Sequence, residues 1–150
     1  MEEFANIIQA EPSKLLLALD NFQSEIITSF LSSTSNNYLD SADKWLNATT
    51  FNTAKFGGQP TKSKIYREKL LDEVEKFLCG DEKYEDDRNK IRNSQDKTEK
   101  YIICVMSTAI GNSIGVAGTF IAPVIVLLLM SFGKMALNAW CAMRKETKTT

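Results

Sequence analysis

Hydrophobic residues recur at helical spacing over two long stretches in the first eighty positions. Residues 13–32 carry apolar side chains at steps of three and four, which places them on one stripe of a helix. The members of that stripe are Leu15, Leu19, Phe22, Ile26 and Phe30. A second helix is predicted over residues 63–78, with Gly80 as its end. Both helices should pack on a common core, and the second would contribute Leu70, Leu71, Val74, Phe77 and Leu78.

Shorter elements complete this part of the chain. An amphipathic helix at the N-terminus should stop before Pro12, because proline disfavours helical geometry in the residue that precedes it. Polar turn residues at 32–37 are followed by a short helix that Asp40 or Ser41 could cap. Residues 47–63 are rich in Gly, Pro, Thr and Asn, so we expect them to form a loop.

Residues 81–100 are dominated by charges of both signs. Their apolar content is limited to Tyr84 and Ile91. A segment with so few apolar side chains has little surface to bury. We therefore expect an exposed helix or a mobile linker here, and not a packed element of the core.

The last third of the chain has the opposite pattern. No formal charge occurs in the 33 residues from Tyr101 to Gly133, and nine more uncharged residues lie between Lys134 and Arg144. A straight helix of 33 residues would be roughly 50 Å long, whereas the hydrocarbon core of a bilayer is about 30 Å thick. One upright span is therefore a poor description of residues 101–143.

A helical hairpin fits this segment better. In this arrangement Gly118 to Pro123 forms a turn or kink between two arms, near 101–117 and 121–143. Basic residues lie beyond both arms, which favours the cytoplasmic side of a membrane for each end. Lys134 would lie inside the second arm, where it has to snorkel to the interface or face water.

The alternative is a kinked or tilted single span over residues 112–133. Residues 134–143 would then lie along the membrane interface, with Trp140 as an anchor. The near symmetry of the charged flanks favours the hairpin over this arrangement.

Small residues recur every four positions in the apolar segment, at Ser107, Gly111, Gly115 and Thr119. On one helix, such residues form a flat strip on which another helix can approach closely. Asn112 lies beside the strip, and its amide is costly in hydrocarbon unless it bonds across an interface or faces water. These residues predict self-association into a homo-oligomer.

The charge distribution bears on the partners and on the location. The chain holds 18 Lys and Arg against 19 Asp and Glu, so no nucleic-acid partner is expected. Residues 101–150 carry four basic residues and one acidic residue, which suits the cytoplasmic surface of an anionic membrane. The acidic N-terminus lacks the pattern of a signal peptide, so residues 1–100 should stay in the reducing cytoplasm.

Candidate chemistry is sparse. The chain has no histidine, which removes the most common general base and most zinc or iron sites. The acidic run at 81–87 includes Lys83 and lacks the pattern of a calcium loop, so it is expected to be a solvated face. We therefore predict a protein that is not an enzyme, with no catalytic residue, no cofactor and no metal site.

The cysteines add no predicted site. Cys79, Cys104 and Cys141 are odd in number and have no CxxC spacing, so neither a disulfide framework nor a zinc site is expected. Cys104 and Cys141 lie within the apolar stretch, where a free cysteine behaves as a small hydrophobic residue.

Together these patterns predict an all-α protein with an amphipathic helical domain (1–80), a charged helix or linker (81–100), an apolar hairpin or kinked transmembrane helix (101–143) and a polar tail (144–150). We expect a membrane protein with a cytoplasmic N-terminal domain that self-associates through its C-terminal helices, as a pore-forming or membrane-disrupting effector. Its partners would be lipid, copies of itself and a protein bound by residues 1–80. The alternative is a soluble cytoplasmic interaction module, such as an adaptor, inhibitor or immunity-type subunit, that buries the apolar helices in a bundle or against a partner.

Overall fold

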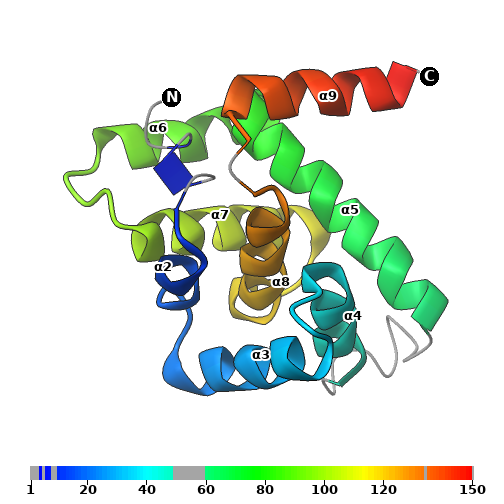
Figure 1. Ribbon diagram of the computed structural model, residues 1–150. Coiled ribbons are helices and arrows are strands. Elements are labelled where there is room, and N and C mark those ends of the chain that lie inside the picture. The colour runs from blue at the N-terminus through cyan, green and yellow to red at the C-terminus, as the bar shows by residue number, and fades with distance from the viewer. Residues whose placement is uncertain (1–3, 5, 8–9, 49–59, 134, 150) are drawn as a thin grey trace.

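The part of the chain that the structure describes is built from helices. The computed structural model describes residues 4, 6–7, 10–48, 60–133 and 135–149, and every regular element within them is helical (Figure 1). The predicted all-α class is therefore confirmed. In chain order the elements are α2 (Pro12–Leu16), α3 (Asn21–Ser33), α4 (Tyr38–Ala48), α5 (Pro60–Cys79), the 3-10 turn η2 (Glu82–Tyr84), α6 (Glu85–Asn93), α7 (Glu99–Ile114), α8 (Gly118–Ser131) and α9 (Leu137–Thr149).

Helix α8 occupies the centre of the fold. Figure 1 shows it enclosed by the other helices, and it packs against α2, α3, α4, α5 and α7. Ten of its 14 residues are buried, including all seven from Val124 to Met130. A helix that is apolar on every face needs cover on every side. The amphipathic helices provide that cover and turn their polar faces outward.

The long helix predicted over 13–32 is wrong, because the chain breaks at 17–20 into α2 and α3. The Asp20 carboxylate accepts a hydrogen bond from the Gln23 backbone N–H at 2.8 Å and caps α3. An aspartate in this role ends one helix and starts another. The break changes the buried face of α3 to Ile27 and Leu31, and it leaves Phe22 71% exposed.

Helix α5 agrees with the prediction, and α4 differs from it at its start. The four residues Leu70, Val74, Phe77 and Leu78 are buried on α5, whereas Leu71 is half-buried, and Gly80 follows the helix with φ +100°. Helix α4 begins earlier than predicted, because the Asn37 side chain accepts the Asp40 N–H at 2.9 Å and replaces Asp40 or Ser41 as the cap. Residues 49–59 of the predicted loop lie outside the described residues.

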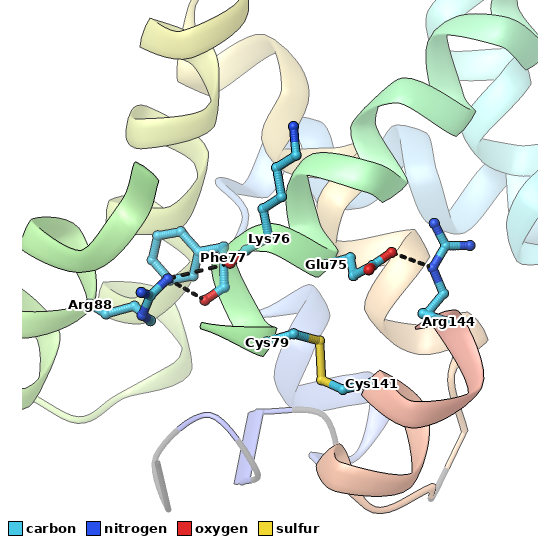
Figure 2. Close-up of a disulfide and its surroundings, with 7 residues drawn as sticks. All are labelled: Glu75, Lys76, Phe77, Cys79, Arg88, Cys141 and Arg144. Atoms are coloured by element: carbon cyan, nitrogen blue, oxygen red, sulfur yellow. Dashed lines mark hydrogen bonds and ion pairs between the residues drawn. A yellow bond between two sulfur atoms is a disulfide. The ribbon is translucent and has the colours of Figure 1, made fainter. Parts of the chain in front are cut away.

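The charged segment packs on the core, contrary to the prediction of an exposed helix or linker. Tyr84 and Ile91 are both buried. The guanidinium of Arg88 is also buried, and it donates to the carbonyl oxygens of Lys76 and Phe77 at the end of α5 (Figure 2). These carbonyls have no partner within their own helix. Two apolar side chains and one capping arginine therefore help to hold the segment against the core.

Buried Glu73 ties α5 to this segment and gives a pH-dependent prediction. Burial raises the pKa of Glu73, but hydrogen bonds from Lys83, Tyr84 and Lys76 outweigh it and leave the pKa below its usual value. A depressed pKa stabilises the fold above the unfolded-state pKa, and this contribution is lost as the pH falls through the folded-state pKa. We expect Glu73→Gln to lower the free energy of unfolding by about 1–2 kcal/mol at pH 7. Urea denaturation at pH 7 and pH 3 should show that this difference is smaller at pH 3.

Candidate functional site

The candidate site is the apolar hairpin formed by α7 and α8. The two helices are bent by 116° with respect to one another. Gly115 ends α7 in the left-handed conformation, with φ +82°, and the backbone N–H groups of Gly115 and Val116 both donate to the Gly111 carbonyl. The turn therefore lies at 115–117, before the predicted turn that begins at Gly118. Gly118 is instead the first residue of α8.

The second arm of the hairpin is shorter than predicted. It was expected to continue to residue 143, but α8 ends at Ser131, and Gly133 follows with φ +69°. With 14 residues, α8 is roughly 21 Å long, less than the roughly 30 Å of a hydrocarbon core. Within the described residues, no single helix has both the length and the apolar character to cross a bilayer, and α7 with α8 meets those two conditions only as a bent pair. Lys134 lies outside the described residues.

The small residues let the start of α8 lie directly on α7. A Cβ atom on Gly111 would be 2.5 Å from the Val116 carbonyl oxygen, and one on Gly118 would be 3.0 Å from the carbonyl group of Ser107. Atoms this close cannot be accommodated without a backbone shift. Ser107 and Gly111 thus serve packing within one chain, and the predicted turn residue Gly118 completes the contact.

The other members of the predicted strip are placed differently. Gly115 ends α7, Thr119 belongs to α8, and Thr119 and Asn112 are both exposed. The four small residues therefore do not share one helix face, as an unbroken helix would require. Their role in self-association remains a prediction.

Pro123 lies inside α8 and does not end it. A proline has no N–H to donate to the carbonyl four residues earlier, and its ring disturbs the preceding turn. The Thr119 carbonyl accepts instead from the Gln23 side-chain amide of α3 at 2.8 Å. The neighbouring Phe120 carbonyl accepts from the indole N–H of Trp45 in α4, also at 2.8 Å. Two covering helices thus bind the interrupted backbone of α8.

This arrangement predicts coupling between Gln23 and Pro123. We expect Gln23→Ala to lower the free energy of unfolding by about 1 kcal/mol, because the Thr119 carbonyl loses its donor. In a Pro123→Ala background the new backbone N–H can donate to that carbonyl, so the same change should cost much less. A double-mutant cycle by urea denaturation measures the difference, and equal costs in both backgrounds would exclude this function of Gln23.

Helix α9 closes the C-terminal end of the hairpin. Trp140 is 2% exposed, and its ring lies 4.2 Å from that of Phe132, which follows α8. Arg144 donates to Glu75 at 2.9 Å and to Asp72 at 2.7 Å, both on α5. In this structure the predicted interface anchor Trp140 is thus a core residue.

A disulfide joins Cys79 at the end of α5 to Cys141 in α9 (Figure 2). This pairing contradicts the expectation of free cysteines, and free Cys104 is exposed. The two partners are separated by 62 positions, so no local spacing could reveal the bond. A faint signal exists in hindsight. Cys79 follows Asp72 and Glu75 on α5, and Cys141 precedes Arg144, so antiparallel helices match cysteine with cysteine and acid with base.

A cavity of about 170 Å³ lies between the α2–α3 junction and the hairpin. Its lining includes Gln23, Lys100, Cys104 and Ser107. The Ser107 hydroxyl has no hydrogen-bond partner, but it is fully buried and therefore closed to a molecule in the cavity. The described residues contain no group of three or more His, Cys, Asp or Glu side chains that could hold a metal ion.

The site is therefore a bent pair of apolar helices in which α8 is largely buried and α7 has exposed residues, and a covalently attached helix closes one end. Comparison of the chain with protein-family models, with curated proteins and with solved structures finds no match.

Proposed function

We propose that this protein stores an apolar helical hairpin inside a closed bundle and delivers it to a membrane, where copies of the chain self-associate. The observation that carries the proposal is the character of α8, which has no charged residue and is buried along nearly its whole length. A helix that is apolar on every face is suited both to a protein core and to lipid. The covering helices and a bilayer are thus alternative environments in which the apolar surface of α8 can be buried.

The energetics permit such an exchange. Apolar surface gains about 25 cal/mol per Å² when it leaves water, and both protein and lipid provide that gain. For α8 itself, moving from one cover to the other therefore costs little hydrophobic free energy. The cost of the exchange is that the faces of α2, α3, α4 and α5 packed against α8 lose their cover. The carbonyls of Thr119 and Phe120 would lose Gln23 and Trp45, but both lie in the first turn of α8, where interfacial water can replace these donors.

Once the hairpin has left the bundle, α8 can become part of a longer helix that is able to cross the hydrocarbon core. If the connection after Ser131 becomes helical, α8 and the uncharged part of α9 form one helix of 26 residues from Gly118 to Met143. Such a helix would be roughly 39 Å long, enough to cross the hydrocarbon core with some tilt. Lys134 would be its one formal charge, and self-association would provide a polar environment for it.

Vesicle binding tests this proposal. The full chain is mixed with vesicles of phosphatidylcholine and phosphatidylserine that contain a self-quenched dye, and flotation and dye release are measured with and without a dithiol reductant. We expect the chain to float with the vesicles, and dye release would distinguish a pore from a plain anchor. A chain that stays monodisperse in buffer and never binds vesicles under either condition would exclude the proposal.

A second candidate is a protein-interaction module that keeps the hairpin inside permanently. The observation that favours it is the pair of exposed apolar side chains beside the α2–α3 break, Leu17 (76% exposed) and Phe22 (71% exposed). The two residues are five positions apart in the sequence, on either side of the break, and contiguous exposed apolar patches mark binding surfaces. Under this function the Leu17→Ser, Phe22→Ser double variant would lose binding to a partner protein, and vesicles would have no effect on the wild-type chain.

A further inference from the structure

The attachment of α9 combines one covalent bond with ion pairs and apolar contacts. The Cys79–Cys141 disulfide joins the helix to α5, and Cys79 is exposed, so a reductant can reach the bond. The ion pair of Arg144 with Asp72 is partly exposed and contributes little, whereas the pair with Glu75 joins two side chains that are each 15% exposed. The apolar part of the contact comes from Leu137 and Trp140. The disulfide is therefore the strongest constraint on α9.

The position of α9 makes this constraint relevant to the hairpin. Helix α9 follows α8 after a short connection, and the stacked rings of Phe132 and Trp140 join the two helices at that end. While α9 is tied to α5, the end of α8 cannot move away from the bundle. The joined helix of residues 118–143 also cannot form, because α9 is held as a separate helix.

We propose that the Cys79–Cys141 disulfide is a redox latch whose reduction frees α9 and lets the hairpin leave the bundle. This inference rests on the proposed function, since it assigns the signal that opens the closed form. The oxidised chain is the storage form. The reduced chain is the form that enters lipid.

A dithiol serves as the reductant. One thiolate of the dithiol attacks Sγ of Cys79, the S–S bond breaks, and Cys141 leaves as a thiolate that takes up a proton. The second thiol of the reductant then loses its proton and attacks the reductant's other sulfur, which is bonded to Cys79 in the mixed disulfide. Cys79 is displaced as a thiolate and takes up a proton. The disulfide gains two electrons and two protons, and the dithiol becomes a disulfide.

Hydrogen exchange of the full chain in buffer, without lipid, tests the latch. We expect dithiothreitol to accelerate amide exchange in residues 137–149 on the order of 100-fold, with little change in α3 and α4. Cys141→Ser should show the fast exchange without reductant, and Cys104→Ser should behave as the wild type. If exchange in 137–149 is unchanged when thiol titration finds three free thiols per chain, the latch is overturned. Finding those three thiols after incubation with oxidised glutathione would overturn it as well.

Adding vesicles separates the latch from the proposed function. If reduction frees α9 and the chain still never binds vesicles, the latch is supported and the membrane function fails. If the oxidised and reduced chains bind vesicles equally, the membrane function is supported and the latch fails. We expect binding only, or at least tenfold more strongly, after reduction.

Discussion

Gly111→Ala is expected to lower the free energy of unfolding by about 3 kcal/mol, through overpacking where α8 starts on α7. The new methyl group would lie 2.5 Å from the Val116 carbonyl oxygen and 3.0 Å from the Gly118 nitrogen. Both are backbone atoms, one in the turn and one in the first residue of α8, and they cannot swing aside as a flexible side chain would. Urea denaturation followed by circular dichroism measures the change.

Gly115→Ala is the matched control for this prediction. Gly115 has φ +82°, and a Cβ atom there would meet nothing within 4 Å. The cost should therefore be the conformational penalty alone, about 1–2 kcal/mol. If the two variants lose the same stability, the close approach of α8 to Gly111 is not a feature of the protein.

Removal of the disulfide is the second change with a large expected effect. Cys141→Ser should lower the free energy of unfolding by about 4 kcal/mol under oxidising conditions, because the bond closes a loop of 62 positions in the unfolded chain. Wild-type protein in dithiothreitol should lose the same amount. Cys104→Ser removes an exposed free thiol and should change stability by less than about 0.5 kcal/mol.

A Cys141→Ser chain as stable as the wild type, with no loss on reduction of the wild type, would mean that the two cysteines are not joined in solution.

The sequence predicted correctly those helices whose start, end and buried face are determined by residues close together in the chain. The periodic apolar face of α5 and the glycine after it are local signals of this kind, and both agree with the structure. The break before α3 was missed because the apolar stripe runs through it, whereas Asp20 stops the helix by capping the next one. For residues 81–100 an exposed helix was one of the predicted alternatives, but their packing on the core was not predicted, because it depends on Tyr84 and Ile91, each an isolated apolar side chain in a charged run.

The sequence predicted the candidate site as an apolar segment, but it could not predict which helices pack against that segment. Small residues at steps of four indicate a helix contact, and sequence alone cannot say whether the partner helix belongs to the same chain. The structure answers this for Gly111, whose neighbour is α8. The donors that Gln23 and Trp45 supply to α8 come from 96 and 75 positions away, so only the tertiary fold brings them together.

The central claim is that α8 exchanges its protein cover for lipid, and photolabelling of the wild-type chain tests it most directly. Vesicles that contain a diazirine-bearing phospholipid are irradiated with the reduced chain, and the labelled peptides are identified by mass spectrometry. The account predicts lipid adducts within Gly118–Ser131 after reduction, and none there in the oxidised chain. Adducts confined to exposed surface residues such as Leu17 and Phe22, with none in α8 under either condition, would contradict it.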